Sequence, residues 1–229
     1  MSSSSLSTHR RALGLGLPEE ARLGPVLALG NVSFDARLGG LPRGRITEFL
    51  GGASVGKTAL MLQALANTIG MGDTISRSGG LAALIDLSGT IFPEPAWAER
   101  KLLVVRPRCA EDALRALDAL LSSAAFDLLA FETSGLVAPL PEVVTVRVAR
   151  LARETGSAVI ACGISSIFGS SCSLRVQLTT LRDGSSRGLV TKSKQGGLGE
   201  EIVLSAPSRN SGGGGVSVPL PVPTPRRVA

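Results

Sequence analysis

Aromatic residues are scarce in this sequence of 229 residues: they make up 3%, as six phenylalanines, one tryptophan and no tyrosine. Few side chains are therefore available to stack on nucleic-acid bases, which many single-strand-binding proteins require. The single histidine, His9, excludes histidine-based metal sites and Ser-His-Asp triads. Any contact with nucleic acid would depend on arginine, lysine and backbone amides.

Cysteines and long apolar runs are also few. The three cysteines, Cys109, Cys162 and Cys172, have no CxxC spacing and leave an odd thiol, so we expect reduced, buried, small apolar side chains. No run of about 18 apolar residues is free of charges and breakers. The N-terminus begins with Met1 and four serines rather than with a basic region leading into an apolar one. These features predict a cytoplasmic protein without membrane contact.

Charge and length allow one basic globular domain. The formal net charge is +6, and 44% of the residues are hydrophobic, which suffices for a buried core. A basic chain suits a partner rich in phosphates or carboxylates, because neutralised phosphates release counterions. The charge is spread along the chain, so this indication is modest.

Both ends of the chain differ in composition from its middle. Residues 1–24 mix serine, arginine and Leu-Gly pairs without a sustained period, which predicts a flexible N-terminal arm. Residues 206–229 contain four successive glycines and alternating prolines, which cannot bury enough apolar area to offset ordering entropy. We therefore expect a disordered Gly/Pro-rich tail after a core domain over residues 25–205.

Within the core, short apolar runs alternate with helical patterns. Near-continuous apolar runs are typical of strands buried on both faces, and their alternation with helices predicts an α/β fold with a mostly parallel sheet. Strands are expected over residues 45–50, 81–86, 102–106, 126–131 and 157–162. Crossover helices are expected over residues 58–67, 110–124 and 141–155.

The pattern changes after residue 162. Shorter strands are expected over residues 174–180, 189–192 and 201–204. The first two are separated by Asp183-Gly184, a dipeptide typical of hairpin turns, and the last two by the pair Gly196-Gly197. The sheet is therefore expected to finish with an antiparallel C-terminal extension.

An eight-residue motif lies between the strand expected over residues 45–50 and the helix expected from residue 58. It fits the pattern G-x-x-x-x-G-K-[ST], in which glycines let backbone amides point inward at a helix N-terminus and bind phosphate. The alternative is a glycine-rich turn that ends by chance in Lys-Thr. The predicted phosphate-binding residues are Gly51, Gly52, Ala53, Ser54, Val55, Gly56, Lys57 and Thr58.

Three side chains have assigned roles at this motif. Lys57 would reach the β- and γ-phosphates of ATP, and the Thr58 hydroxyl would ligate Mg²⁺, which prefers oxygen ligands. Glu132 follows a buried strand, where an acidic residue can organise the metal. The same carboxylate could instead cap the following loop, and the sequence favours neither role.

Residues 34–48, which contain the turn Leu41-Pro42-Arg43-Gly44-Arg45-Ile46, resemble together with this motif the RecA recombinase family. The resemblance covers residues 29–204 and implies a RecA-like P-loop NTPase core. Within the superfamily the chain is most similar to the short, divergent ImuA proteins. That similarity implies RecA, ImuB and a DnaE-type error-prone polymerase as partners, in SOS-type mutagenesis and translesion synthesis.

The sequence departs from the RecA pattern at two positions that serve hydrolysis. Ser88 stands where the family has its water-activating glutamate, and Gly163 stands where it has a sensor glutamine. A general base contributes about 10²- to 10⁴-fold to rate, and serine cannot supply it at neutral pH. Glu94, between two prolines, is a poor substitute. We therefore predict nucleotide binding with weak or absent hydrolysis and no catalytic residue.

Grip on DNA is predicted to be weak or indirect. Residues 165–173, at the place of RecA's second DNA loop, contain no lysine or arginine, and Arg175 and Arg182 would give only diffuse phosphate contacts. Lys192 and Lys194 resemble the paired lysines that reach a neighbour's nucleotide in RecA, or they only discourage pairing at a sheet edge. Alternative functions are a DNA-dependent ATPase of RecA or RadA type and a SulA-like inhibitor of cell division.

Overall fold

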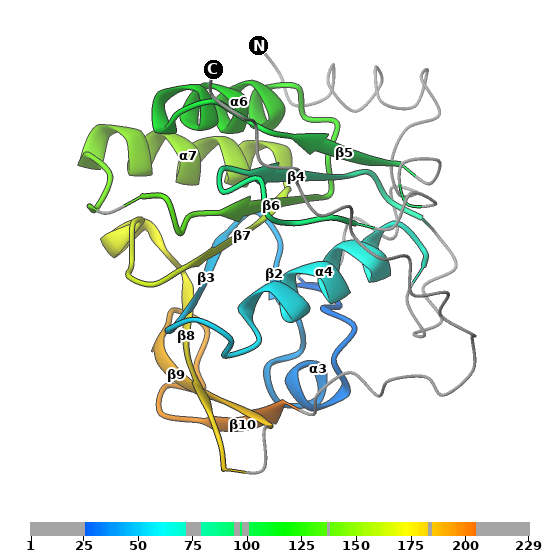
Figure 1. The fold of residues 1–229 in the computed structure, drawn as a ribbon, viewed down its shortest axis with the longest axis vertical. Coiled ribbons are helices and arrows are strands. Elements are labelled where there is room, and N and C mark those ends of the chain that lie inside the picture. Colours follow the sequence, from blue (N-terminus) through cyan, green and yellow to red (C-terminus); the bar gives the residue numbers. More distant parts are fainter. Residues whose placement is uncertain are drawn as a thin grey trace, which may run out of the picture.

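The computed structural model describes residues 26–71, 79–93, 97, 101–136, 138–182 and 185–204. An eight-stranded sheet in the order β10-β9-β8-β3-β7-β6-β4-β5 forms its centre (Figure 1). The six strands from β8 to β5 are parallel, while β9 pairs antiparallel with both β8 and β10. The strands are β3 (Ile46–Leu50), β4 (Ala82–Asp86), β5 (Leu102–Val105), β6 (Leu128–Glu132), β7 (Ala158–Gly163), β8 (Leu174–Thr180), β9 (Ser186–Ser193) and β10 (Glu201–Leu204).

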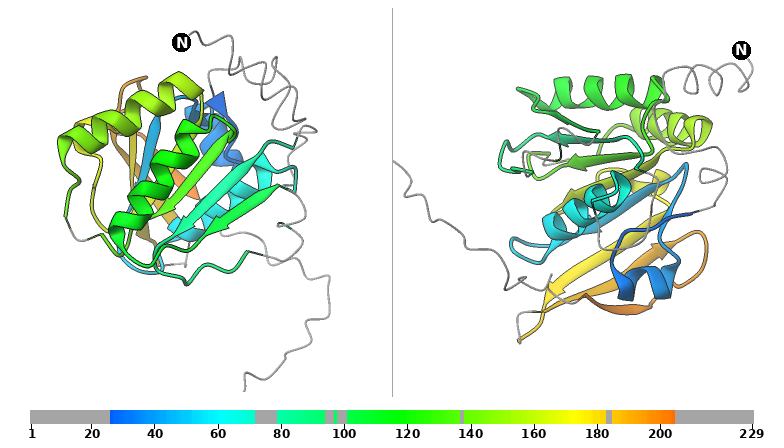
Figure 2. Two further views of the ribbon diagram at one scale, coloured as in Figure 1. Left: turned by 90° about the horizontal axis from the view of Figure 1, so that it is seen from above. Right: turned by 90° about the vertical axis from the view of Figure 1, so that its right-hand side faces the viewer.

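Helices cover both faces of the parallel part (Figures 1 and 2). Helix α4 (Lys57–Thr68) packs on one face, and α6 (Ala110–Ser122) and α7 (Glu142–Thr155) pack together on the other. Strands β3, β4, β6 and β7 are buried along their whole length, as the near-continuous apolar runs predicted. The predicted α/β fold with an antiparallel extension is therefore confirmed.

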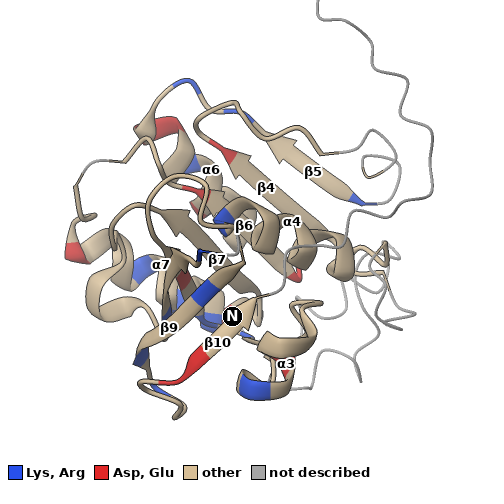
Figure 3. Ribbon diagram, turned by 60° about the horizontal axis from the view of Figure 1, so that its bottom comes forward, with Lys and Arg blue, Asp and Glu red and all other residues tan. Residues whose placement is uncertain are grey.

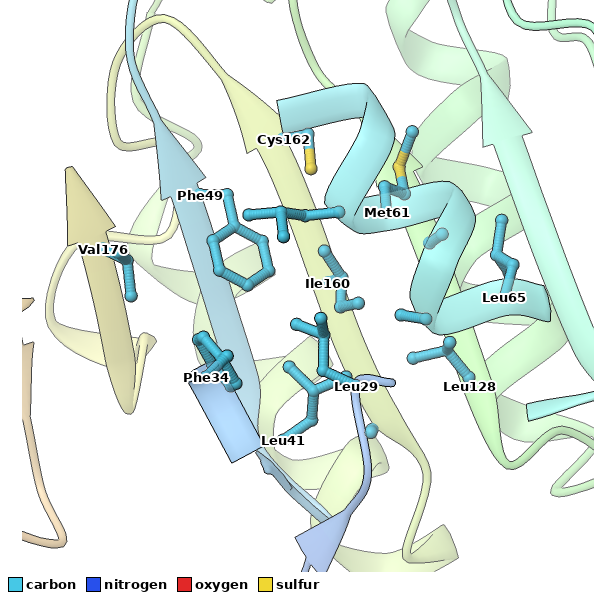
Figure 4. Packing of buried hydrophobic residues seen from close by; sticks show 14 of the residues in the cluster. Leu29, Phe34, Leu41, Phe49, Met61, Leu65, Leu128, Ile160, Cys162 and Val176 are labelled. Carbon is cyan, nitrogen blue, oxygen red and sulfur yellow. The ribbon is translucent and has the colours of Figure 1, made fainter. Parts of the chain in front are cut away.

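Two apolar clusters fill the space between helices and sheet. The cluster beneath α4 joins Met61 and Leu65 of the helix to Phe49 and Ile160 of the sheet (Figure 4). Phe34 contacts Phe49 edge to face with ring centroids 5.8 Å apart. The second cluster lies under α6 and α7. The central strands are thus held from both sides, which fixes the strand ends where the motif lies.

Short elements ahead of β3 were not predicted. These are β1 (Val26–Leu27), α3 (Val32–Leu38) and β2 (Leu41–Pro42), and a 3-10 turn η1 (Gly169–Ser171) also follows β7. The Asn31 side chain caps α3 by accepting from the Phe34 amide. Gly39 ends the helix with a left-handed backbone, φ 73°. A helix of about two turns carries too few apolar positions for a visible period.

Element boundaries differ from the predictions by a few residues. Strand β9 begins at Ser186 rather than three residues later, because it pairs along β8 from Thr180↔Ser186 to Leu174↔Ser193. The turn predicted at residues 183–184, the arm at 1–24 and the tail at 206–229 lie outside the described residues. Among the described helices, none is both long enough and apolar enough to cross a membrane.

The expectation of three buried cysteines is wrong for one of them. Cys109 is exposed because it lies at the start of α6, in the connection from the edge strand β5. Cys162 and Cys172 are buried free thiols, as expected. Burial raises the pKa of both, that of Cys172 to about 12. These two thiols therefore remain protonated and unreactive in the folded state.

Candidate functional site

The predicted phosphate-binding motif forms the connection from β3 to α4. Gly51 continues β3 with φ 153°, and a Cβ there would lie 2.6 Å from the Leu178 carbonyl oxygen. Gly56 is the N-cap of α4 with φ 90°, and a Cβ there would lie 2.8 Å from Ser186 Oγ. A Cβ at Gly51 would collide with the backbone of β8, and the positive φ at Gly56 would strain any other residue, so both positions favour glycine.

The interior of the loop is open to solvent. Gly52, Ala53 and Ser54 are exposed, whereas Val55 is buried beneath them and anchors the loop to the core. Ser54 has φ 59°, a left-handed conformation that is uncommon outside glycine. This turn brings the chain into the first turn of α4, whose amides and dipole favour an anion. The backbone therefore fits a phosphate group.

Lys57 folds back onto this loop. Its Nζ donates to the carbonyl oxygens of Gly51, at 2.7 Å, and of Gly52. Partial burial lowers the pKa of Lys57, while the nearby Cys162 thiol and Glu132 carboxyl act in the opposite direction. A phosphate is a stronger acceptor than a neutral carbonyl, so a bound nucleotide would compete for this ammonium group. The exposed Thr58 hydroxyl stands at the next position, open to a metal ion.

Two buried acidic residues end the neighbouring strands. Asp86 of β4 and Glu132 of β6 are register partners, and both side chains are shielded from water. Glu132 accepts the Ser134 amide at 2.7 Å and the Ser88 amide at 3.2 Å, one on each carboxylate oxygen. The carboxylate thus caps the loops after both strands. Each oxygen has a further lone pair, so ligation of Mg²⁺ by Glu132 remains a prediction.

The loop after β4 is organised by Asp86. Its carboxylate accepts the Ser88 hydroxyl at 2.9 Å and the amides of Gly89 and Ile91, and Arg106 Nε lies 3.5 Å away. Ser88 Oγ also lies 2.7 Å from Thr90 Oγ1. The Ser88 hydroxyl is therefore part of a local hydrogen-bond network. Glu94 lies outside the described residues.

At the end of β7, Gly163 leaves room for a residue that sequence reasoning missed. A Cβ on Gly163 would lie 2.4 Å from Thr133 Oγ1, well inside van der Waals contact. The Thr133 hydroxyl instead donates to the Cys162 carbonyl at 2.9 Å. The Gly163 carbonyl in turn accepts the Gly51 amide at 3.2 Å. A threonine directly after Glu132 was the only signal of this packing.

The segment after β7 is held by the buried carboxylate of Glu48. It accepts the amides of Ile167 and Phe168 at 3.0 and 2.9 Å, the Ser166 hydroxyl at 2.8 Å and Arg175 Nε at 2.9 Å. An acidic residue within a buried strand could have signalled such a network. The segment is thus a fixed structural connection, and the Arg175 guanidinium is used in it.

Lys192 is engaged in the same region. Its Nζ donates to the carbonyl oxygens of Gly169 and Ser170, at 2.9 and 3.0 Å. Partial burial lowers the pKa of Lys192, and the positive charges of Arg175 and Lys194 lower it further. Lys192 therefore stabilises the η1 turn, whereas Lys194 is exposed. The two lysines predicted to act as a pair have different surroundings.

Comparison with known proteins agrees with this geometry. The RecA N-terminal domain model matches residues 13–149. Proteins called "Protein RecA" are similar over parts of their length: that of Acidothermus cellulolyticus is 36% identical over 144 residues, which cover 59% of this chain and 39% of that protein. For Clavibacter michiganensis the identity is 38% over 137 residues, with coverages of 56% and 35%. For Nitratidesulfovibrio vulgaris it is 36% over 151 residues, with coverages of 60% and 40%.

The chain thus spans about two fifths or less of the length of these relatives. The matched region contains the phosphate-binding motif, Ser88 and Glu132, but ends before Gly163. The family model matches more than half of this chain. The chain belongs to the RecA family.

Proposed function

We propose that this chain is a RecA-family accessory protein of SOS-type DNA damage tolerance and translesion mutagenesis. It works in the cytoplasm by binding RecA, ImuB or both, and the DnaE-type error-prone polymerase is a further candidate partner. ATP with Mg²⁺ binds at the loop of residues 51–58, with Thr58 and Glu132 on the metal side. Contact with DNA is weak or indirect.

The environment of Ser88 carries this proposal. The position that follows β4 offers a hydroxyl already bonded to Asp86 and Thr90, where hydrolysis needs a carboxylate to accept a proton from water. Bound Mg²⁺ would supply charge neutralisation at the phosphates. It would not supply the missing base. A nucleotide then stabilises one conformation of the chain rather than being consumed.

The internal contacts of two basic side chains support the same function. Arg175 and Lys192 are bonded within the chain, so neither is available to hold a DNA strand without breaking those contacts. A RecA-like fold in which these two side chains are engaged would still present a RecA-like surface. Such a surface is suited to binding the proteins with which RecA-family members assemble.

A DNA-dependent ATPase of RecA or RadA type is the second candidate. The 36 to 38% identity to RecA proteins and the complete phosphate-binding motif favour it. In that case another carboxylate would position the attacking water.

Calorimetric titration with ATP and Mg²⁺, paired with a phosphate-release assay, separates the two candidates. We expect binding that Lys57→Ala weakens at least about tenfold, or about 1.4 kcal/mol, and phosphate release that single-stranded DNA does not stimulate. DNA-stimulated release abolished by Lys57→Ala would establish the ATPase instead. Immobilised chain should retain purified RecA or ImuB at micromolar concentration. Retention of neither protein would refute the accessory role.

A further inference from the structure

A basic cleft lies at the opposite end of β3 from the phosphate-binding loop. It has a volume of about 320 Å³ and lies between α7, the start of β3 and the residues from η1 to the start of β8. Four cationic side chains line it, from three separate parts of the chain: Arg45, Arg150, Arg153 and Lys194. Figure 3 shows lysine and arginine positions along α7 and on β9. The cleft is therefore distinct from the nucleotide site.

The positive charge of this cleft is largely uncompensated. Within the described part of the chain, Arg45, Arg153 and Lys194 make no ion pair, and Arg150 has only Glu154, at 3.6 Å. That pair is solvent-exposed on both sides and so neutralises little. Four cations around one small cleft repel one another unless an anionic ligand is bound.

Toward the N-terminal end of α7, the helix face that carries Arg150 and Arg153 is aliphatic. Val143 and Val146 are 76% and 52% exposed, although both are large and apolar. Together with Arg150 and Arg153 they follow three- and four-residue spacing, so the four side chains form one stripe. Ten residues of helix place the ends of this stripe about 15 Å apart. An extended peptide of about five residues has that length.

We propose that this stripe and cleft bind an acidic segment of a partner protein. Its carboxylates would face the four cations, and its aliphatic side chains would cover Val143 and Val146. Arginine favours this pairing because its planar guanidinium matches a carboxylate bidentately. The inference rests on the proposed function, in that the chain acts by binding another protein, and it names the surface that does so.

A nucleic acid or a neighbour's nucleotide fits this surface less well. Phosphates would satisfy the cations but leave the exposed valines uncovered, and the described residues that line the cleft include no aromatic side chain for base stacking. An acidic and aliphatic peptide satisfies both halves. The surface also sets how the peptide is placed along α7. The acidic residues of the peptide would lie near the C-terminal end of the helix, where Arg153 is, and its aliphatic residues near the N-terminal end.

Fluorescence anisotropy tests the surface directly. The probes are labelled peptides of about eight residues with leucines at one end and aspartates and glutamates at the other, made in both chain directions. Matched peptides carry asparagine and glutamine in place of the acids, or serine in place of the leucines. We expect the acidic-aliphatic probe to bind the full chain in a salt-dependent manner, and both matched peptides to bind at least about tenfold more weakly.

Charge reversal locates the binding site. Arg153→Glu should weaken the probe at least about tenfold. Arg115→Glu is the control, since it makes the same charge change on α6, where Arg115 is exposed and paired with Glu111. Lys194→Glu repeats the test from another element, in case Arg153→Glu disturbs α7. Circular dichroism verifies that each variant is folded.

Any of four results would overturn the inference. One is the absence of probe binding in either direction, and another is equal weakening by the Arg115 variant. The third is binding of ATP or of single-stranded DNA at this cleft that is tighter than binding of the peptide probe and that Arg153→Glu weakens equally. If RecA or ImuB is retained equally by wild type and Arg153→Glu, this surface is excluded while the accessory role stands. If the probe binds but neither protein is retained, the accessory role fails alone.

Discussion

Replacing Arg175 by methionine removes one half of a buried ion pair. Arg175 lies 2.9 Å from the fully buried Glu48 carboxylate and is itself 22% exposed. Methionine keeps most of the side-chain volume but leaves a buried negative charge without its cation. Breaking such a pair costs about 3–5 kcal/mol when it is deeply buried. Partial exposure of Arg175 and the amides that remain on Glu48 reduce the expected cost to about 2–4 kcal/mol.

Urea unfolding and thermal melts measure this cost. A loss of this size lowers the melting temperature by roughly 10 °C in a domain of this size. The matched control is Arg187→Met, which breaks an exposed pair with Glu201 at 3.5 Å and should cost less than about 1 kcal/mol. Adding Glu48→Gln to Arg175→Met should recover part of the loss, because the charge is removed while an amide oxygen still accepts. A loss below about 1 kcal/mol for Arg175→Met would refute the assignment of this pair as a main support of residues 166–169.

Three further predictions concern single contacts. Gly163→Ala should destabilise the chain by about 1–3 kcal/mol in urea unfolding, and the loss should shrink in a Thr133→Ala background, because the new methyl collides with the Thr133 hydroxyl. A hydrogen bond from Arg147 lowers the pKa of Asp118 from its ordinary value of 3.8. The pair therefore stabilises the fold above pH 3.8, and this stabilisation is lost as the pH falls through the lower pKa of the folded state. The difference in melting temperature between wild type and Asp118→Asn should accordingly vanish in acid. Cys109 should react with a thiol reagent in the native state, whereas the two buried cysteines should react only after unfolding.

The central strands and crossover helices were predictable because each carries a strong local pattern. The apolar runs that became β4 and β6 can bury both faces only inside a sheet, and the pattern around Leu117 fits only a helix. The loop of residues 51–58 was predictable because its glycines, Lys57 and Thr58 are adjacent in sequence. Local patterns thus predicted the fold class and the position of the loop proposed to bind phosphate.

Long-range contacts were not predictable from single segments. The Glu48 network joins residues more than a hundred positions apart, and nothing near Glu48 in the sequence indicates its partners. The exposure of Cys109 depends on where α6 begins, which its composition does not define. The role of Thr133 depends on the approach of β6 and β7. These features arise from packing between elements rather than within them.

Both positions at which this chain departs from the RecA pattern lie within local structural contacts. Ser88 bonds to Asp86 and Thr90 within the loop after β4, and the space at Gly163 is taken by Thr133. A glutamate at position 88 would place a third carboxylate beside Asp86 and Glu132 and would lose these hydroxyl bonds. Restoring that carboxylate alone is therefore expected to destabilise the loop without creating efficient hydrolysis. Both departures are thus held by local contacts, which supports the proposal that the loop of residues 51–58 binds a nucleotide without efficient turnover.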